Sequence, residues 1–385
     1  MRLAIVTTHP IQYNAPWFRL LAQQSDIEVK VFYTWEASEN VAKYDPGFGK
    51  VIAWDIPLLE GYEYTFVRNI ASDQGSHRYK GIDNPTLNKE IAAWGAQAIL
   101  VFGWAYKSHL GCIRHFKNKI PVLFRGDSTL LDETGGIKQI IRRVLLRYVY
   151  SFIDYALYVG QNNKNYYLKH GINERQLVFV PHAIDNDRFA ADENTFHEEA
   201  KRWKATIGIP ENCFTILFAG KLEAKKNPEY LLKLAKRLKD PDFRFVIVGN
   251  GEQEPMLKKA AENDNRIFFL DFQNQKKMPI IYRVGDVFVL PSKGPGETWG
   301  LAINEAMACG RPVITSTKTG GAIDMVADNG IILDPDDIDT AEKYIRHLKS
   351  DQSYYRQQSG NAKSKVSAYS YKKVVETITE LLRTF

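Results

Sequence analysis

Two glutamates, Glu297 and Glu305, lie eight positions apart where a strand is predicted to pass into a helix. The surrounding segment, VLPSKGPGETWGLAINEAMACGRPVITS, predicts a strand ending near Pro291, a loop rich in glycine and proline, and a helix opening at about Gly300. Glycine lets backbone approach a ligand closely, and free N–H groups at a helix start bind anions. Because ionised carboxylates only accept hydrogen bonds, this pair suits the hydroxyls of a sugar, not a phosphate.

A second segment, FAGKLEAKKNPEYLL, places Gly220, Lys221 and Lys226 after another predicted strand. Two lysines at a strand end suit neutralisation of a diphosphate and of the charge on a leaving phosphate. A third segment, VIVGNGEQEPML, resembles a dinucleotide-binding fingerprint, but Glu254 stands at the third glycine position. The first predicted strand is followed by THPIQYN, which contains no glycine, so the sequence disfavours a dehydrogenase.

Length and composition indicate an ordinary globular protein. A chain of 385 residues favours two domains, and 44% hydrophobic with 25% charged residues is typical of such folds. The net charge of +6 is too small to argue for nucleic acid. No apolar run approaches the ~20 residues that span a bilayer, and the N-terminus does not look like a signal peptide. Three scattered cysteines, Cys112, Cys213 and Cys309, are interpreted as buried thiols in a reducing, cytoplasmic compartment.

Short apolar runs alternate with helical segments along the whole chain, and the pattern predicts two Rossmann-like, doubly wound parallel-sheet domains that face each other across a cleft. The polar stretch 185–212 suggests a boundary between domains 1–195 and 196–370, with the last helix, 371–385, crossing back to the first. The predicted strands are Arg2–Thr7, Glu28–Tyr33, Ala98–Phe102, Pro121–Arg125, Tyr155–Val159, Val178–Pro181, Thr215–Ala219, Arg244–Val248, Ile267–Leu270, Val287–Leu290, Pro312–Thr315 and Gly330–Leu333.

The C-terminal half resembles a known family. ETWGLAINEAMACGRPVI looks like the motif of the retaining glycosyltransferases of family four, which have the GT-B fold. The basic Gly-Lys-Leu segment, the VGNGE turn, IIYRVGDVFVLPS and the TGG at Thr319–Gly321 follow the same order as in that family. The N-terminal half matches more loosely, through PHAIDNDRF.

The resemblance implies roles for individual residues in binding a nucleotide-diphosphate sugar. Glu305 would hold the ribose hydroxyls and Glu297 the hydroxyls of the donor sugar, with Lys221 and Lys226 on the diphosphate. A lysine at position 221, where the family usually has arginine, keeps the charge but loses the bidentate fork. Phe272 is a candidate contact for the base. The backbone near sugar and phosphate would come from Thr298, Trp299, Gly300 and Leu301.

The side of the site that would meet the acceptor departs from the family pattern. Many members carry a histidine after the strand that corresponds to VLFRGDST, where this chain has Arg125 and Asp127. Arg125 would take over an electrostatic role and Asp127 would orient the acceptor hydroxyl, although a structural ion pair at the strand end is the competing interpretation. The first strand–helix loop, HPIQYNAP, replaces the usual glycine pair, and we place His9, Tyr13 and Asn14 on the acceptor side.

These features predict a retaining hexosyltransferase that uses a UDP- or GDP-sugar and a glycan or lipid-linked glycan acceptor, in bacterial surface or exopolysaccharide assembly. No metal ion and no cofactor are expected, because the acidic run 334–337 is interpreted as a turn and a helix N-cap. Two alternatives remain: a sugar-nucleotide epimerase of GT-B-like fold, and a non-catalytic protein that binds sugar nucleotides.

The segment from Arg114 to Arg147 has eight basic residues against three acids, and its later part, IKQIIRRVLLRYVYSF, is apolar on one side and basic on the other. One interpretation is a helix packed on the core with a solvated face. The other is peripheral contact of residues 138–149 with an anionic membrane at its cytoplasmic face, which would suit a lipid-linked acceptor.

Overall fold

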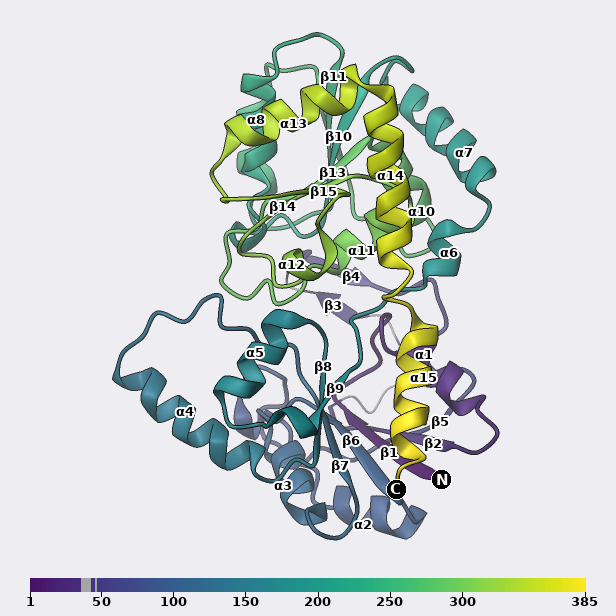
Figure 1. Cartoon of the computed structure of the whole chain (residues 1–385), viewed down its shortest axis with the longest axis vertical. Coiled ribbons are helices and arrows are strands. Elements are labelled where there is room, and N and C mark those ends of the chain that lie inside the picture. The colour runs from purple at the N-terminus through teal and green to yellow at the C-terminus, as the bar shows by residue number, and fades with distance from the viewer. Residues whose placement is uncertain (36–42, 46) are drawn as a thin grey trace. The chain divides into compact units, whose positions relative to one another are not determined.

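The computed structural model describes residues 1–35, 43–45 and 47–385, which form two compact units. Unit 1 takes in residues 1–35, 57–182 and 371–385, and unit 2 takes in residues 43–45, 47–56 and 183–370. The segment 371–385 is therefore part of unit 1, although the chain reaches it from unit 2 (Figure 1).

Unit 1 is built on a sheet of seven strands in the order β5-β2-β1-β6-β7-β8-β9, with parallel pairing between neighbours. Apolar side chains at nearly every position of the central strands explain why helices cover both faces of this sheet. The strands are β1 (Arg2–Thr7), β2 (Glu28–Tyr33), β5 (Glu63–Phe66), β6 (Ala98–Phe102), β7 (Val122–Arg125), β8 (Tyr155–Tyr158) and β9 (Leu177–Phe179).

Unit 2 is built on a sheet of six strands in the order β12-β11-β10-β13-β14-β15, again parallel throughout. A two-stranded antiparallel hairpin, β3 (Lys43–Asp45) and β4 (Lys50–Ile52), also belongs to this unit. The six strands are β10 (Phe214–Ala219), β11 (Phe243–Val248), β12 (Ile267–Leu270), β13 (Val287–Leu290), β14 (Val313–Ser316) and β15 (Gly330–Leu333).

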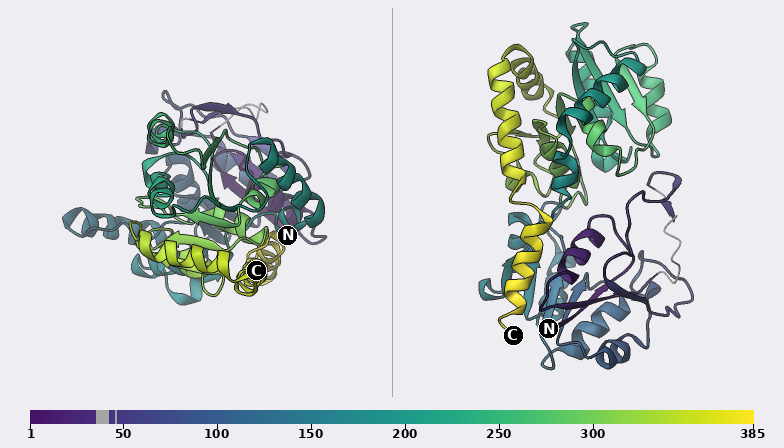
Figure 2. Two further views of the ribbon diagram at one scale, coloured as in Figure 1. Left: turned by 90° about the horizontal axis from the view of Figure 1, so that it is seen from above. Right: turned by 90° about the vertical axis from the view of Figure 1, so that its right-hand side faces the viewer.

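Helices pack around each sheet, and Figure 2 shows these layers from two further sides. Unit 1 contains α1 (Ala15–Ala22), α2 (Leu87–Trp94), α3 (Lys107–Phe116), α4 (Ile137–Tyr150), α5 (Gln161–Lys169) and α15 (Tyr371–Leu382), with short 3₁₀ turns η1 (Tyr79–Gly81) and η2 (Glu174–Gln176). Unit 2 contains α6 (Asn186–Ala190), α7 (Glu193–Thr206), η3 (Ala224–Lys226), α8 (Glu229–Arg237), α9 (Glu254–Ala261), α10 (Met278–Val284), α11 (Leu301–Ala308), α12 (Ala322–Met325), α13 (Ile338–Ser350) and α14 (Gln352–Val366).

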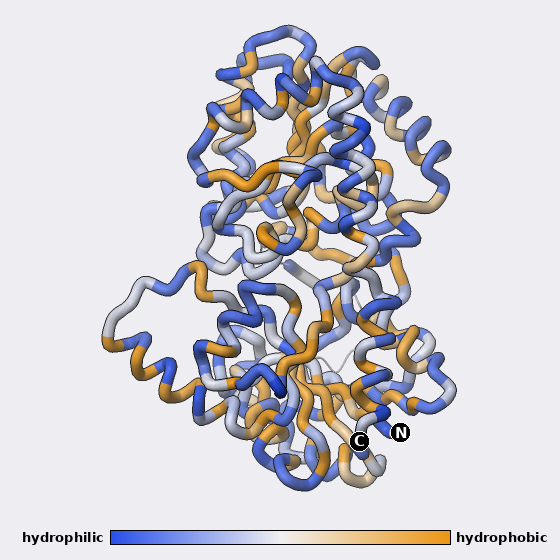
Figure 3. The backbone as a smooth tube through the Cα atoms, in the orientation of Figure 1, coloured by the Kyte–Doolittle hydropathy of each residue, from blue (hydrophilic) through white to orange (hydrophobic). Residues whose placement is uncertain are grey.

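The cores follow the apolar strands, as the hydropathy colouring of Figure 3 shows. In unit 1, α15 packs beside α1 and buries Val374, Ile378 and Leu382. In unit 2, Phe218, Phe243 and other large side chains are fully buried around the sheet. None of the helices in the described ranges is both long enough and apolar enough to cross a bilayer.

All of the predicted strands are present, within a residue or two of their predicted ends, and the predicted class of two Rossmann-like parallel-sheet units is confirmed. The acidic run also behaves as predicted, because the Asp337 side chain caps α13 by accepting a hydrogen bond from the Thr340 N–H at 3.0 Å. The prediction lacked β5 and the hairpin. β5 is a short edge strand with a half-buried, mixed sequence, and short edge strands lack the continuous apolar run that marks a central strand.

The boundary between the units falls after residue 182, earlier in the chain than the predicted 195/196. The reason is α6, whose Phe189 is fully buried and whose Phe189 carbonyl accepts a hydrogen bond from Arg283 at 2.9 Å. The adjacent Arg188 donates to the Gln275 side chain at 2.8 Å. This polar segment is thus packed against α10 and α11 and belongs to the body of unit 2.

Candidate functional site

A buried ion pair joins the two chemistry-bearing segments of unit 2. Lys226 Nζ lies 2.7 Å from Glu297 Oε2, and the Glu297 side chain is only 8% exposed. The two residues follow β10 and β13, which are neighbours in the parallel sheet, so the carboxyl ends of both strands meet at one edge. The sequence predicted both residues separately, and the sheet order brings them into contact.

The backbone between the two glutamates is held by a second loop. Gly320 N–H donates to the Glu297 carbonyl at 2.9 Å, and Gly321 N–H donates to the Trp299 carbonyl at 2.8 Å. A Cβ atom at Gly320 would collide with the Thr298 carbonyl oxygen, so only glycine fits there. This contact gives the TGG segment a physical role, which is to fix the path of the loop that precedes α11.

The start of α11 depends on Gly300, whose φ of +93° is the left-handed conformation that favours glycine. The helix begins at Leu301, as predicted to within a residue, and its first N–H groups lack helical acceptors by geometry. Thr298 and Leu301 are half-buried, while the Trp299 indole is buried and donates to Asn304 Oδ1 at 2.9 Å. The loop is therefore anchored by Trp299 and can present its backbone to an anion.

Glu305 lies inside unit 2 and not on a helix surface. The side chain is 3% exposed, and Oε2 accepts a hydrogen bond from the Tyr282 hydroxyl at 2.7 Å. Tyr282 comes from α10 and packs edge-on against Phe288 of β13. A buried carboxylate oriented by a tyrosine is pre-organised to accept hydrogen bonds from a ligand's hydroxyl groups.

Among the described residues, the ion-pair partner of Lys221 is Asp45 of the β3–β4 hairpin and not Glu297. The Lys221 Nζ atom lies 2.8 Å from Asp45 Oδ1 and 3.0 Å from Asp45 Oδ2, and 5.0 Å from the centre of the Phe48 ring. Burial alone would raise the pKa of Asp45, but the hydrogen bond and charge of Lys221 outweigh it, and the pKa of Asp45 is lowered. Asp45 is thus an ionised partner of Lys221, the lysine that the resemblance assigns to the diphosphate.

Phe272 forms an aromatic cluster at the end of β12. The Phe272 ring centre lies 4.8 Å from that of Phe48 and 6.1 Å from that of Trp54. The Phe272 N–H donates to Asn250 Oδ1 at 2.9 Å, which ties this residue to the VGNGE turn. In that turn, a Cβ atom at Gly249 would collide with the carbonyl oxygen of Gly220, so the glycine allows β10 and β11 to end close together.

The predicted acceptor-side residues of the first loop lie in unit 1, after β1. His9, Tyr13 and Asn14 are all half-buried. His9 Nδ1 lies 2.9 Å from the Thr8 hydroxyl oxygen, and the His9 ring meets Trp35 edge-on at 5.3 Å. Asn14 stands at the N-cap position of α1 and accepts a hydrogen bond from the Trp17 indole at 3.4 Å.

Arg125 is buried at the end of β7 and is engaged by backbone. Its guanidinium donates to the Val180 carbonyl at 2.8 Å and to the Pro181 carbonyl at 3.0 Å. Burial lowers the pKa of Arg125 to about 10, although the neighbouring Tyr167 and Asp127 act in the opposite direction. Two backbone carbonyls therefore hold the guanidinium, and both the ion-pair interpretation and an electrostatic role of Arg125 in the reaction stay predictions.

Asp127 lies near His182, the last residue of unit 1 before the chain enters unit 2. Asp127 Oδ2 lies 3.8 Å from His182 Nε2, and the His182 side chain is 21% exposed. Burial lowers the pKa of His182, against the opposing effect of Asp127. Because Arg125 holds Val180 and Pro181, it also fixes the position of His182 beside Asp127.

Three residues at these sites had no separate signal in the sequence: Asp45, Tyr282 and His182. Asp45 lies in a hairpin that the strand pattern did not predict, far from Lys221 along the chain. Tyr282 belongs to IIYRVGDVFVLPS, where an aromatic residue in an apolar run indicates only a core position. His182 precedes the first residue of unit 2 and could be recognised only from its distance to Asp127.

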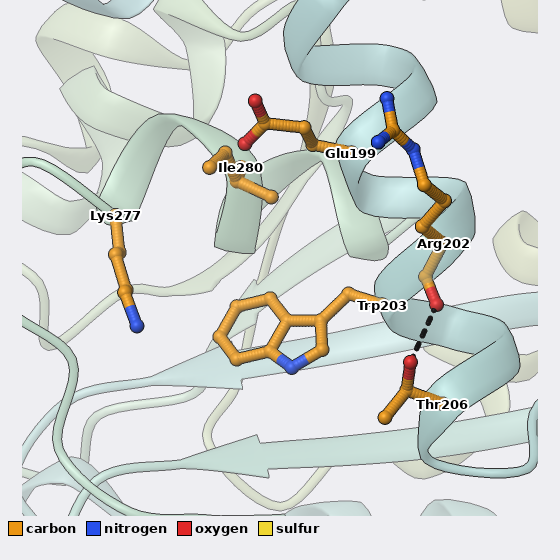
Figure 4. Close-up of a pocket in the computed structure, with 6 residues that line it drawn as sticks. All are labelled: Glu199, Arg202, Trp203, Thr206, Lys277 and Ile280. Atoms are coloured by element: carbon orange, nitrogen blue, oxygen red, sulfur yellow. Dashed lines mark hydrogen bonds between the residues drawn. The ribbon is translucent and has the colours of Figure 1, made fainter.

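Two cavities of unit 2 lie along α7, and neither is lined by a predicted site residue. The first has a volume of about 290 Å³ and surrounds Trp203, with Lys277 and Ile280 opposite α7 (Figure 4). The second, of about 470 Å³, lies beside Lys201, Lys204 and Arg283. Within the described residues, no group of three or more His, Cys, Asp and Glu side chains is arranged to hold a metal ion.

Comparison with known proteins agrees with the predicted resemblance. Residues 199–365 match the family described as "Glycosyl transferases group 1", so this domain carries both lysines and both glutamates. The chain has the GT-B fold, and its similarity to that glycosyltransferase family covers residues 199–365.

Curated relatives match this chain over part of its length. An uncharacterized glycosyltransferase of Methanocaldococcus jannaschii is 30% identical over 46% of this chain and 46% of its own length. A D-inositol 3-phosphate glycosyltransferase of Mycolicibacterium smegmatis is 31% identical over 44% of this chain and 39% of its own length. The matched region thus spans about half the length of these relatives or less.

Solved structures match the fold over the whole chain. A glycosyltransferase from Rickettsia africae superposes with a TM-score of 0.76 at 14% identity, covering 99% of this chain and 97% of the other. Anabaena HepE in complex with UDP and glucose gives a TM-score of 0.72 at 16% identity, covering 100% of both chains. At these identities the likeness establishes the fold only.

Proposed function

We propose that this chain transfers a hexosyl group from a nucleoside-diphosphate sugar to an acceptor hydroxyl, with retention of the anomeric configuration. The observation that carries the proposal is the buried Lys226–Glu297 pair beside the start of α11, within the domain that matches glycosyl transferases group 1. The lysine and the N–H groups at the helix start suit the phosphates of a nucleotide sugar, and the glutamate suits the hydroxyls of its sugar.

On the donor side, Glu305 accepts hydrogen bonds from the ribose and Glu297 from the sugar, while Lys221 and Lys226 contact the diphosphate with Gly220 close by. The backbone of Thr298, Trp299, Gly300 and Leu301 lines sugar and phosphate. These assignments come from the family resemblance, and the burial of both glutamates supports them. Phe272 is proposed to contact the base, supported by its aromatic cluster at the end of β12.

In the proposed reaction the bond between the sugar's anomeric carbon and the phosphate oxygen breaks, and the bond to the acceptor oxygen forms on the same face. The acceptor proton passes to the departing phosphate oxygen, so no protein nucleophile takes part. Both lysines stabilise the negative charge that develops on the diphosphate. The reaction as proposed needs no metal ion and no cofactor.

On the acceptor side we retain His9, Tyr13, Asn14 and Asp127 as contacts for the incoming hydroxyl. Asp127 is the proposed orienting group. Arg125 is proposed to contribute positive charge from its buried position, and its hydrogen bonds to Val180 and Pro181 support an additional positioning role.

The proposed donor is a UDP- or GDP-sugar and the proposed acceptor is a glycan or lipid-linked glycan of a bacterial surface or exopolysaccharide. Two similarities support this range. A relative in Mycolicibacterium smegmatis, 25% identical over 58% of this chain, is a GDP-mannose-dependent mannosyltransferase acting on a phosphatidylinositol monomannoside. Anabaena HepE was solved with UDP and glucose. We propose a cytoplasmic location at the inner face of the membrane.

The first test is a thermal-shift panel of nucleoside diphosphates and their sugars, because a ligand that binds the native state raises its apparent stability. We expect one nucleotide class to raise Tm, and we expect the matching sugar nucleotide to be consumed only when an acceptor is present. Conversion of the donor sugar without an acceptor would identify an epimerase instead. Chelation of divalent metals is expected to leave transfer unchanged.

The second test separates the two glutamates. Glu305→Ala is expected to weaken nucleotide binding at least tenfold, and Glu297→Gln is expected to reduce transfer by two orders of magnitude or so while nucleotide binding persists. Glu262→Gln, an exposed change in the same unit, is the control. Unchanged turnover in both site variants would overturn the assignment, and a defect of Glu297→Gln confined to binding would favour a non-catalytic binding protein.

A further inference from the structure

Helix α4 turns hydrophobic side chains outward. Six large apolar residues on this one helix are exposed, from 46% for Leu145 to 77% for Ile137. Elsewhere in the described chain, no helix or strand carries more than one exposed large hydrophobic side chain. The six are Ile137, Ile140, Ile141, Val144, Leu145 and Tyr148. The interpretation of this segment as a helix whose apolar side meets the core is therefore wrong for most of its apolar residues.

The spacing of these residues makes one continuous stripe. At ~100° per residue they fall on the side of the helix opposite Leu146, Val149 and Tyr150, which are the residues that α4 buries in unit 1. The helix is thus apolar on two opposite sides, and the outer one has no covering element among the described residues. Figure 1 shows α4 at the periphery of unit 1.

Positive charges line both edges of the outer stripe. On the same helical projection Lys138 and Arg142 lie along one edge, and Arg143 and Arg147 lie along the other. The helix sequence contains no acidic residue, and none of these four cations forms an ion pair with a carboxylate in the described part of the chain. Lys138 and Arg147 are exposed and therefore available to an anionic partner, whereas Arg142 also donates a hydrogen bond to the Tyr166 hydroxyl at 3.2 Å.

We infer that α4 docks unit 1 on an anionic lipid bilayer, with the helix lying in the plane of the interface. An apolar stripe between rows of arginine and lysine matches the boundary between acyl chains and negatively charged headgroups, where such a helix sinks by ~5–10 Å. The helix has 14 residues, fewer than the ~20 needed to cross the hydrocarbon core. A second copy of the chain fits less well, because pairing two such stripes would bring arginines against arginines.

This inference deepens the proposed function, and rests on it only where it suggests that the acceptor is lipid-linked. The docking itself is independent of sugar transfer. Its chemistry specifies the partner as a membrane with acidic headgroups and not a neutral one, because surface charge contributes attraction for each basic residue near the lipid.

The test uses the full chain and vesicles of phosphatidylcholine with or without phosphatidylglycerol. We expect sedimentation with the mixed vesicles and little with pure phosphatidylcholine. The triple variant Ile140→Ser, Val144→Ser, Tyr148→Ser is expected to lose binding at least tenfold, and Lys138→Gln with Arg147→Gln to lose it roughly tenfold and to flatten its salt dependence. In a separate variant, the fluorescence of Tyr148→Trp should shift to the blue on anionic vesicles only.

The control is Ile70→Ser with Ile323→Ser, which removes exposed apolar side chains from two other places and should leave vesicle binding unchanged. Circular dichroism and Tm are expected to stay at the wild-type values in all variants, since every changed residue is exposed or half-buried. Equal vesicle binding by the triple variant and the wild type would overturn the inference. So would a wild-type dimer that the triple variant dissociates, with no binding to vesicles. Transfer to a water-soluble acceptor without vesicles should be the same in the triple variant and the wild type, which separates this inference from the proposed reaction.

Discussion

At the scale of single residues, each charged side chain proposed to bind the sugar nucleotide already has a partner within unit 2. Glu297 holds Lys226, Tyr282 holds Glu305, and Asp45 holds Lys221. A buried carboxylate without such a partner would be strongly disfavoured, and these contacts supply the hydrogen bonds that the buried groups lose with water. A ligand that binds here has to exchange these contacts for its own.

Tyr282→Phe tests whether this pairing also prepares the site. Loss of the 2.7 Å hydrogen bond to Glu305 should cost about 1–2 kcal/mol of unfolding free energy and should weaken nucleotide binding several-fold. Tyr230→Phe is the matched control, because the Tyr230 hydroxyl donates to the Asp337 carbonyl, away from the proposed ligand. Urea unfolding and nucleotide titration of both variants separate the two effects, and equal nucleotide affinity in both would contradict the role of Tyr282.

Asp45→Asn tests the competition at Lys221. Removing the carboxylate charge while keeping the side-chain shape should strengthen binding of a nucleoside diphosphate by about two- to fivefold, the range expected for a partly exposed ion pair. The effect should shrink at high salt. Asp336→Asn, which breaks a surface pair with Lys293 in the same unit, is the control. Weaker nucleotide binding by Asp45→Asn, measured by calorimetry, would show that the hairpin assists the ligand.

At the scale of elements, the order of the parallel strands decides which side chains of the following loops and helices come into contact. The β6–α3 loop of unit 1 gives an example outside the proposed site, because His109 of α3 is fully buried there. His109 Nδ1 lies 2.9 Å from the Phe102 carbonyl and therefore donates to it, and Nε2 lies 2.8 Å from the Thr34 hydroxyl oxygen, which also lies 3.2 Å from the Thr7 carbonyl oxygen. Both contacts suit a neutral ring.

This geometry predicts a pH dependence of stability. Burial lowers the pKa of His109 from 6.5 to about 4, despite the opposing hydrogen bonds to Gly103 and Phe102. Between these values the unfolded chain binds a proton that the folded protein does not, so the free energy of unfolding falls as pH drops from about 6.5 to 4, by up to about 3 kcal/mol.

Urea unfolding across this pH range checks the prediction. His109→Gln should remove this part of the slope, while the exposed His115→Gln should keep it. An unchanged slope in His109→Gln would assign the acid sensitivity to other groups.

At the scale of the whole molecule, each unit is assembled from stretches that are separated in the sequence. The chain passes from unit 2 into α15, whose apolar side completes unit 1 beside α1. The β3–β4 hairpin belongs to unit 2, although residues 57–182 of unit 1 separate it from the rest of that unit. Each unit therefore depends on segments that lie far from its main stretch of sequence.

Ile378→Ala tests this dependence. The residue is fully buried in α15, and its truncation should cost about 2–5 kcal/mol of the stability of unit 1. We expect calorimetry to show one unfolding transition at lower temperature while a transition stabilised by nucleotide stays in place. Lys372→Ala, on the exposed side of the same helix, should change neither. A loss of nucleotide affinity in Ile378→Ala would instead couple α15 to unit 2.

The sequence by itself determined the sheet-forming runs and the two-unit architecture, and it singled out Lys221, Lys226, Glu297 and Glu305 as candidate contacts for a sugar nucleotide. It could do so because continuous apolar runs, glycine-rich strand ends and a motif of fixed spacing are local properties of the chain. The tertiary structure decided which of these residues touch. It paired Glu297 with Lys226 through the order of β10 and β13, brought Asp45 to Lys221, and gave Arg125 two backbone carbonyls.

The tertiary structure also decided which apolar side of α4 is buried and which is exposed. Periodicity along a helix shows that an apolar stripe exists, but the side that meets the core depends on which neighbours pack against it. In this protein Leu146, Val149 and Tyr150 fill the core, so the remaining apolar stripe points outward. The sequence fixes such patterns locally, whereas contacts between distant segments arise only when the sheet and its helices are assembled.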